Sequence, residues 1–312
     1  MNRIALLIGA LLVPCICGAV DWGLSIRVDE RSSFIQNGED GRVHSDYTNL
    51  DIRGSLDNAL SFRFRNRVNV LSSSGDFLTA TDILYLQYRF GNWEFLAGKY
   101  QQEYGGYEYD ENIINLYFCG LYYDNFVGAF NWCANVSRLT ENGKITAQFA
   151  KSPFSSRWNP DLFAYNLGYR GTHGIWSPKW SVNLFDTPEG WRTAHMSLGN
   201  SFAAGPVTVE LDYITRTDTR DFRPFIDWSL AGKFLYSFGG HLDVFAKVNM
   251  DRNPSVADLF VPVGTDFFSW GGGLEFYPNA NRRDVRMHLA YCNNGISNIS
   301  AGVTWRVQLF NH

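Results

Sequence analysis

The residues best suited to act on solutes are arginines that recur at alternate positions. Arg63, Arg65 and Arg67 stand two residues apart, between apolar or neutral neighbours. In an extended strand that rises about 3.3 Å per residue, their side chains would start about 6.6 Å apart on one face. This spacing lies inside the screening length of about 8 Å in physiological salt. The three charges repel one another unless water or carboxylates surround them, which predicts a hydrated face.

The same alternation places further arginines on that face of other strands. In a membrane-spanning strand, an arginine turned towards lipid would cost about 2–4 kcal/mol near the bilayer midplane. The arginines are therefore expected to face an enclosed lumen, on strands that become neighbours once the last strand closes on the first. This predicted basic wall comprises Arg27, Arg53, Arg63, Arg65, Arg67, Arg89, Arg286 and Arg306.

The second candidate is a loop over residues 101–124, which interrupts the alternation found on either side of it. The segment holds five acids and six tyrosines and contains no lysine or arginine. A long irregular loop within a compact protein usually has a function. We interpret this acidic loop as folded into the lumen, where it narrows the water path with Glu103, Tyr104, Gly105, Gly106, Tyr107, Glu108, Asp110 and Glu111.

Cations on one wall opposite carboxylates on a loop would create a transverse electric field. Such a field orders water and dipolar solutes and disfavours apolar ones, as in pores with rings of charged side chains. The alternative is that these arginines form the solvated inside of a structural barrel, pair with acids and block flow. A barrel of about sixteen strands leaves a lumen that a few side chains cannot fill, which favours the pore.

The elements that position these residues follow a period of two from Asp21 onward. Segments of about ten residues alternate apolar and polar positions, as expected of membrane-spanning strands. In one such segment, Val207, Val209 and Leu211 alternate with polar residues. The connections are short and long in turn. All prolines beyond the leader are assigned to connections, because proline cannot donate to a strand ladder.

This pattern predicts an all-β fold: a transmembrane antiparallel β-barrel of about sixteen strands in one domain, with short periplasmic turns and longer outer loops. The acidic loop becomes the third outer loop, folded into the lumen. An even strand number places both termini on the periplasmic side. The alternative is a soluble β-sandwich, which would bury its apolar faces and use shorter strands.

Residues 1–19 have the layout of a cleaved secretory signal, in which one positive charge precedes a short apolar run. The barrel would then occupy residues 20–312. A formal net charge of -4 gives no reason to expect nucleic-acid binding. Cleavage would leave Cys119, Cys133 and Cys292, which we interpret as isolated thiols because no pair has metal-ligand spacing.

Catalysis has little support in the sequence. The histidines are scattered, without a serine or aspartate at triad spacing and without a cluster of metal ligands. His195 and His288 lie on predicted inward faces, where we expect them to be solvated. We therefore expect no enzyme activity, no metal site and no cofactor.

Two adjacent motifs resemble a known family. Ala97-Gly98-Lys99 is followed by a Gly-Gly-aromatic-acid loop at residues 105–110. This order is similar to that of the phosphate-selective porin O/P family, and the similarity extends diffusely from Leu84 to the C-terminus. The resemblance implies a sixteen-stranded outer-membrane porin, commonly trimeric, with an inward third loop. The best-known members place basic residues in that loop, so the acidic loop here argues against carrying phosphate selectivity across.

Residues and resemblance together predict an outer-membrane porin, exported through the secretory signal, that conducts small hydrophilic solutes or ions passively. Its selectivity is expected to be general or weak. The expected partners are outer-membrane lipids and the permeating solutes, with a homotrimer as one option. Two alternatives stay open. One is a saccharide-selective channel whose loop tyrosines stack on sugar rings, and the other is a non-conducting or enzymatic outer-membrane barrel.

Overall fold

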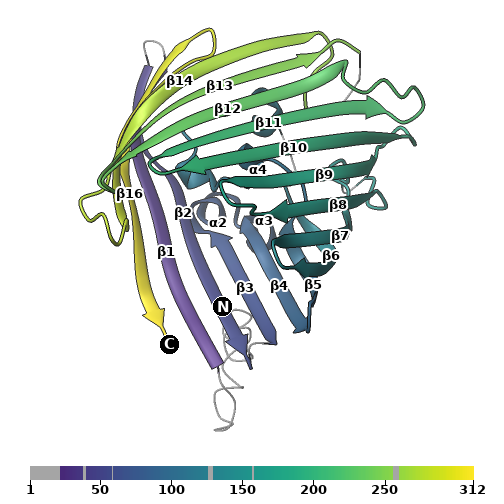
Figure 1. The fold of residues 1–312 in the computed structure, drawn as a ribbon, viewed down its shortest axis with the longest axis horizontal. Coiled ribbons are helices and arrows are strands. Elements are labelled where there is room, and N and C mark those ends of the chain that lie inside the picture. The colour runs from purple at the N-terminus through teal and green to yellow at the C-terminus, as the bar shows by residue number, and fades with distance from the viewer. Residues whose placement is uncertain (1–21, 38–39, 58, 126–128, 157, 256–259) are drawn as a thin grey trace.

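The described residues form sixteen antiparallel strands in the computed structural model (Figure 1). The description covers residues 22–37, 40–57, 59–125, 129–156, 158–255 and 260–312, so the predicted signal at residues 1–19 lies outside it. The strands are β1 (Trp22–Asn37), β2 (Asp40–Leu56), β3 (Leu60–Arg67), β4 (Thr81–Phe90), β5 (Trp93–Gln101), β6 (Phe130–Thr140), β7 (Gly143–Lys151), β8 (Phe163–Gly171), β9 (Trp176–Asp186), β10 (Arg192–Ala204), β11 (Val207–Asp218), β12 (Asp227–Phe238), β13 (Leu242–Asn253), β14 (Thr265–Phe276), β15 (Val285–Asn293) and β16 (Ser297–Asn311).

The strands pair in chain order and β16 pairs with β1, so the sheet is a closed barrel. At the seam, the Leu24 N–H donates to the His312 carbonyl oxygen at 3.2 Å, and the His312 N–H donates to the Leu24 carbonyl oxygen at 2.9 Å. Closure removes the unpaired strand edges that an open sheet would expose. Lipid could not form hydrogen bonds with the backbone N–H and C=O groups of such edges. The predicted antiparallel barrel of about sixteen strands is confirmed.

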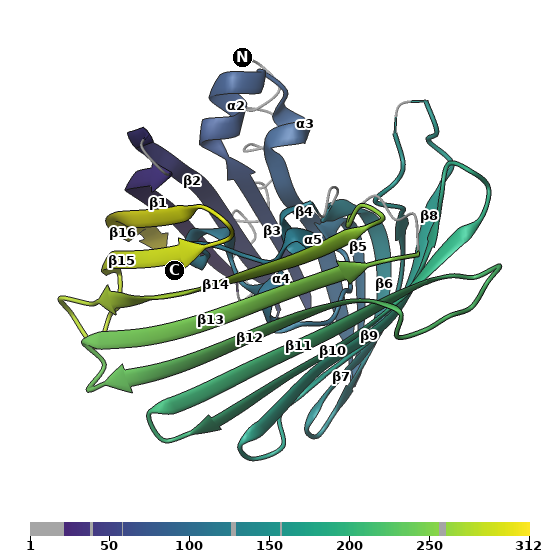
Figure 2. The same cartoon turned by 90° about the horizontal axis from the view of Figure 1, so that it is seen from above.

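Short helices occur in two of the described connections. Between β3 and β4 lie α2 (Val68–Ser74) and α3 (Phe77–Ala80). Between β5 and β6, within the acidic loop, lie α4 (Tyr107–Asp110), η2 (Ile113–Asn115) and α5 (Leu121–Asp124). Seen from above, α4 and α5 of the acidic loop lie within the ring of strands (Figure 2). None of the helices among the described residues is long and apolar enough to cross a membrane.

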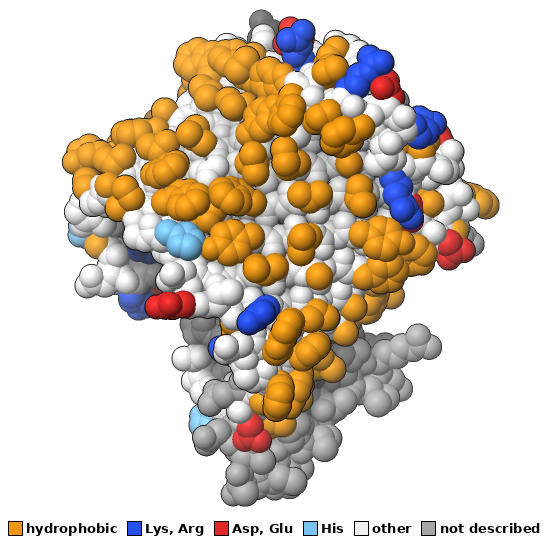
Figure 3. All heavy atoms as spheres, turned by 45° about the vertical axis from the view of Figure 1, so that its right-hand side comes forward, with side chains coloured by type: hydrophobic (Ala, Val, Ile, Leu, Met, Phe, Trp, Pro, Cys, Tyr) orange, Lys and Arg blue, Asp and Glu red, His pale blue; other side chains and the backbone are white. Residues whose placement is uncertain are grey.

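Burial in this barrel is the reverse of burial in a soluble protein. On β13, the alternate residues Asp243, Lys247 and Asp251 are buried, whereas Val248 exposes 41% of its surface. On the side of the barrel seen in Figure 3, apolar side chains are spread over the outer face and charged ones lie mainly towards its edges. In a soluble sandwich, those apolar residues would meet in a dry core. The observed pattern fits strands that face lipid outside and polar groups inside.

The turns follow the local sequence closely, with one exception to the proline prediction. Gly91 and Gly205 adopt φ angles of 55° and 58° in the short connections, where residues with a β-carbon are disfavoured. Pro178, which was expected in a connection, lies inside β9. It precedes Lys179, where the ladder with β8 begins. Its assignment to a connection was therefore wrong by a few residues at the strand start.

Leu86 and Gln87 of β4 offer a direct test of the barrel's orientation. Leu86 faces outward with 58% of its surface exposed, and Gln87 faces the interior. We expect Leu86→Arg to lower the free energy of unfolding in lipid vesicles by about 2–4 kcal/mol, because it places a charge against lipid. The matched variant Gln87→Arg should change it little. Denaturant titration followed by tryptophan fluorescence measures both, and equal losses would contradict the assignment of faces.

Candidate functional site: the acidic loop and the basic wall

The acidic loop, residues 102–129 in the structure and described except at 126–128, begins against β9. The Gly105 N–H donates to Ser181 Oγ at 2.8 Å, and the Gly106 N–H donates to the Lys179 carbonyl oxygen at 3.1 Å. A β-carbon on Gly105 would lie 2.7 Å from that carbonyl oxygen, and one on Gly199 would lie 2.6 Å from the Gly106 Cα. Glycine is therefore required at both contacts, because backbone packs directly on backbone.

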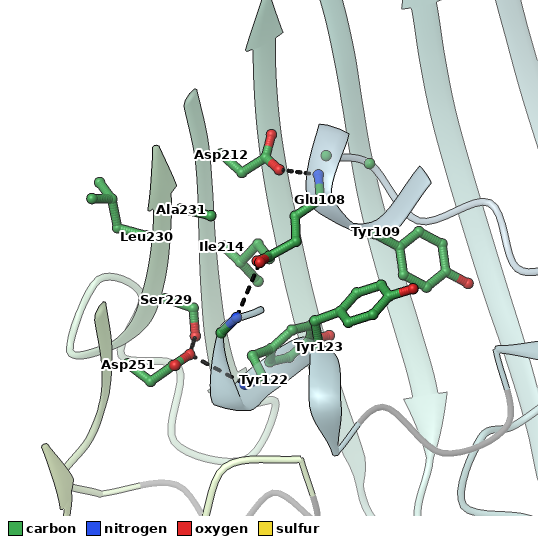
Figure 4. A pocket seen from close by; sticks show the side chains of 13 residues that line it. Glu108, Tyr109, Tyr122, Tyr123, Asp212, Ile214, Ser229, Leu230, Ala231 and Asp251 are labelled. Atoms are coloured by element: carbon green, nitrogen blue, oxygen red, sulfur yellow. Dashed lines mark hydrogen bonds between the residues drawn. The ribbon is translucent and has the colours of Figure 1, made fainter. Parts of the chain in front are cut away.

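Two buried aspartates anchor the short helices of the loop. Asp212 on β11 accepts hydrogen bonds from the N–H groups of Tyr107 at 2.8 Å and Glu108 at 2.7 Å. Asp251 on β13 accepts one from the Leu121 N–H at 2.8 Å. Figure 4 shows both carboxylates at a pocket that residues of α4, α5 and β11 to β13 line together. Backbone donors at the start of a helix are favourable partners for a carboxylate.

Two acids of the loop, Glu103 and Asp110, are paired with cations of β8 and β9. Arg170 donates through Nε to Glu103 Oε1 at 2.6 Å and through Nη2 to Asp110 Oδ1 at 3.1 Å. Lys179 Nζ lies 3.1 Å from Asp110 Oδ2. Both carboxylates were expected to face the basic wall. They face Arg170 and Lys179 instead. Their charges are neutralised on the opposite side of the barrel.

The other two predicted constriction acids have partners on β12 and β13. Lys247 Nζ lies 2.5 Å from Glu108 Oε1 and also donates to the Phe118 carbonyl oxygen at 2.9 Å. Lys233 Nζ lies 3.7 Å from Glu111 Oε2, which is a looser ion pair. The loop thus binds to the wall by ion pairs along β8 to β13. The expected field between loop acids and wall arginines is correspondingly reduced.

Three of the six tyrosines of the loop form an apolar core inside the barrel. Tyr104, Tyr109 and Tyr122 are buried together with Phe185 and Phe260, which come from β9 and from the connection after β13. Burial raises the pKa of the Tyr109 hydroxyl well above its ordinary value. These three rings pack the loop on the wall, and their faces are taken by neighbouring side chains. They are not placed to stack on a sugar.

Both inward histidines are buried, which contradicts the expectation that they are solvated. His195 Nδ1 lies 3.0 Å from the Tyr104 hydroxyl and 3.1 Å from the Tyr122 hydroxyl. His288 stacks on Tyr117 with ring centroids 4.4 Å apart. The loop covers both imidazoles, which are only 1% and 5% exposed. The sequence could not show this, because the covering residues are distant in the chain.

The three cysteines among the described residues, Cys119, Cys133 and Cys292, are free thiols, as predicted. Burial raises the pKa of the Cys119 thiol above its ordinary range, and the nearby Glu108 carboxylate acts in the same direction. The thiol therefore stays protonated at physiological pH and is a weak nucleophile. Among the described residues, no group of three metal-ligating side chains comes together.

One carboxylate organises three arginines of the basic wall. Asp51 on β2 lies 2.8 Å from Arg53, 2.7 Å from Arg63 on β3 and 3.8 Å from Arg27 on β1. Arg27 also pairs with Asp29 at 2.8 Å. The side chains of Arg53 and Arg27 are 48% and 31% exposed although they point inward, so solvent reaches this part of the wall.

The other wall arginines have different surroundings. Asp82 lies 3.3 Å from Arg65, which is nearly buried, and 3.0 Å from Arg67, which is one-third exposed. Arg89 is exposed beside the short turn after β4. Arg286 on β15 and Arg306 on β16 donate hydrogen bonds to the acidic loop. The side chain of Arg286 is only 6% exposed.

Several residues of this site were missed in the sequence. The cations that hold the loop acids were not predicted, and neither were the aspartates that hold the wall arginines or the loop helices. These are Arg170, Lys179, Lys233, Lys247, Asp51, Asp82, Asp212 and Asp251. Alternation alone could have placed seven of them on an inward face; Asp82 has the parity of the outward Leu86 and turns inward at a register shift between β3 and β4. It could not have paired them.

The geometry agrees with comparisons to known proteins. A sequence model of the family "Phosphate-selective porin O and P" matches residues 27–148. The match begins before Leu84, where the predicted resemblance began, and it does not extend to the C-terminus. No curated protein matches the sequence. The chain has the porin fold. The anion-selective porin from Comamonas acidovorans is 10% identical, with a TM-score of 0.66 over 92% of this chain and 100% of that one.

Two other outer-membrane barrels are similarly close to this porin fold. OmpT of Vibrio cholerae in its trimer form is 12% identical, with a TM-score of 0.64 over 93% of this chain and 99% of that one. OmpF of Salmonella typhi in complex with daunomycin is 12% identical, with a TM-score of 0.63 over 92% and 97%. At these identities the likeness concerns the fold.

Arg170 should control how firmly the loop is held. We expect Arg170→Gln to speed chymotrypsin cleavage in the acidic loop by about tenfold, because two carboxylates lose a charged hydrogen-bond donor. Arg192→Gln is the matched control, since Arg192 forms an ion pair with Asp186 that is exposed and does not touch the loop. Mass spectrometry of the fragments locates the cuts. Equal cleavage rates in both variants would show that Arg170 does not restrain the loop.

Proposed function

We propose that the protein forms a water-filled channel in the bacterial outer membrane for passive diffusion of small hydrophilic solutes or ions. The observation that carries this proposal is the partly exposed, inward arginine group around Asp51. Ionised side chains inside a lipid-facing barrel need water or counter-charges. Here counter-charges are incomplete and solvent reaches the guanidinium groups, which supports an aqueous path along β1 to β3.

The position of the path follows from where the acidic loop is attached. The loop binds side chains of β8, β9, β11 and β13 and reaches β15 and β16. Its apolar core fills the inside along β7 to β11. On β1 to β3, Arg31 donates to the loop, whereas Arg27, Arg53 and Arg63 pair with Asp29 and Asp51. Solutes would therefore pass between the loop and the strands that carry Arg27, Arg53 and Arg63.

The charges on this side support a weak preference for anions. Arg27, Arg53 and Arg63 face Asp29 and Asp51, so three positive charges against two negative ones leave a formal charge of +1. An excess of one charge in a hydrated, partly screened lumen biases ion entry modestly. This fits a general or weakly selective channel better than one built for a single anion.

We infer a passive channel rather than an enzyme. The two inward histidines are buried under the loop and are out of reach of a solute. The saccharide-selective alternative is weakened because Tyr104, Tyr109 and Tyr122 lie in the apolar core. Export through a cleaved signal at residues 1–19 belongs to the same proposal, and N-terminal sequencing of the mature protein tests it.

An outward carboxylate supports assembly of several copies. Glu30 lies on the outer face of β1 and accepts hydrogen bonds from Ser32 Oγ at 3.3 Å and from Thr48 Oγ1. Glu30, Ser32 and Thr48 form a polar patch on the outer face, and a second copy packed over β1 and β2 would shield it from lipid. The trimer form of the similar Vibrio cholerae OmpT suggests three copies. We therefore propose a homotrimer.

Conductance tests the channel and its charge together. Purified protein in a planar bilayer should give stepwise conductance, and the double variant Arg53→Gln, Arg63→Gln should shift the reversal potential in a salt gradient towards cations. The change removes two positive charges and leaves a formal charge of -1 in the group. Arg138→Gln is the control, because Arg138 lies outside, 5.8 Å from the Trp93 ring. Repeated absence of conductance would rule out the channel, and an unshifted potential would exclude these arginines from the path.

Assembly has a separate test on the outer face. Thr48→Trp enlarges a residue of the polar patch and should convert multimers to monomers, as measured by light scattering in detergent. Val248→Trp, at an outward position on β13 that is 41% exposed, should leave the mass unchanged. A monomeric parent protein would refute the homotrimer, and an unaltered Thr48→Trp multimer would refute this interface.

A further inference from the structure

The tip of the acidic loop is a single 3-10 turn, η2, that offers neutral acceptors to the barrel wall. The Asn115 N–H donates to the Asn112 carbonyl oxygen at 2.7 Å, and the Leu116 N–H donates to the Ile113 carbonyl oxygen at 3.1 Å. The Asn112 side chain accepts from the Ile114 N–H at 3.3 Å and caps the turn. A turn closed in this way points several carbonyl groups to one side.

Arginines of three consecutive strands meet this turn. Arg31 of β1 donates through Nη1 to the carbonyl oxygens of Ile113 at 3.1 Å and Leu116 at 2.7 Å. Arg286 of β15 donates through Nη2 to the Ile114 carbonyl oxygen at 2.6 Å. The strands β15, β16 and β1 are neighbours because the barrel closes. The tip is therefore attached on the side opposite to the ion pairs that hold the rest of the loop.

Asn115 is the side chain that joins this turn to the wall. Its Oδ1 accepts from Arg286 Nη1 at 2.9 Å and from Arg306 Nη2 at 2.9 Å. Its Nδ2 donates to Glu111 Oε1 at 2.6 Å. A carboxamide can accept two hydrogen bonds and donate at the same time, whereas a carboxylate only accepts and an apolar side chain does neither. The residue type at this position is therefore chemically specific.

We propose that Asn115 is a positioning residue that holds the acidic loop across the barrel and so sets the width of the water path. The inference rests on the proposed channel function. Without this clamp, the loop stays anchored on β11 and β13 through Asp212 and Asp251, and its tip keeps only the hydrogen bonds that Arg31 and Arg286 donate to its backbone carbonyl groups. With its side-chain bonds to Arg286 and Arg306 lost, the tip can move away from β15 and β16 towards the space beside β1 to β3. The tip would then open and close the path instead of bordering it.

The first test removes the hydrogen bonds while keeping the size of the side chain. In a planar bilayer, Asn115→Leu should raise the frequency of brief closures by about tenfold, because two hydrogen bonds to charged donors are lost. Arg306→Gln removes a single partner from the wall side and should give a smaller increase. If both variants close as rarely as the parent protein, the proposal is overturned.

The second test exchanges donor and acceptor between neighbours. In the double variant Glu111→Gln, Asn115→Asp, the new carboxylate can accept from Arg286, Arg306 and the new amide, and the net charge does not change. We expect it to restore quiet gating, whereas Asn115→Asp alone places two carboxylates side by side and should not. If the double variant closes as often as Asn115→Leu, the hydrogen-bond assignment is wrong.

A third measurement separates this inference from the channel itself. Amide hydrogen exchange of the folded barrel in detergent should be about tenfold faster at residues 113–116 in Asn115→Leu than in the parent protein. The amides of residues 107 and 108, held by Asp212, should keep their protection. Unchanged exchange at the tip would overturn the clamp even in a conducting protein. Faster exchange in a protein that never conducts would support the clamp and refute only the proposed channel.

Discussion

Ion pairs and hydrogen bonds between the acidic loop and the inner wall hold this structure together. Asp212 and Asp251 are buried on inward faces, where a carboxylate without partners would be strongly unfavourable. The loop supplies the backbone donors that both groups need. In return, Arg170 and Lys247 of the wall neutralise the acids of the loop. Loop and barrel therefore depend on each other, and neither presents a satisfied interior alone.

This mutual pairing also decides what charge remains for solutes. A carboxylate that is bound by a cation at 2.5–3.1 Å contributes little to the field farther away, because the two charges form a short dipole. Cations along β8 to β13 neutralise the acids of the loop in this way. The arginines around Asp51 are not fully compensated, and they are partly exposed. The proposed weak selectivity follows from a small residual charge in water, not from an absence of charged groups.

Much of the fold could be predicted because a strand has a period of two. Alternation places Arg53 and Arg63 on the inner face and Leu86 on the outer face without knowledge of any contact, and the count of strands follows from the turns. The position of Pro178 shows the limit of this reasoning. A proline is tolerated there because the ladder between β9 and β8 does not extend to it.

The partners within the site could not be predicted, because they depend on the order of strands around the closed ring and on the path of an irregular loop. Arg170 and Glu103 are 67 residues apart in the chain, and nothing in either local sequence indicates their contact. The same holds for His195, which was expected in water and is covered by Tyr104 and Tyr122. Alternation predicts the face of a residue, whereas burial on that face depends on what folds over it.

The two kinds of loop attachment differ in their response to conditions. The ion pair of Lys233 with Glu111 is long at 3.7 Å, with both side chains about one-quarter exposed, so salt weakens it. The tip is bound differently, since Asn115 is neutral and the side chain of its partner Arg286 is only 6% exposed. Salt screens such a buried contact much less. The tip can therefore keep its place at ionic strengths that loosen the Lys233–Glu111 ion pair. The width of the path then depends more on the Asn115 contact than on the acids of the loop.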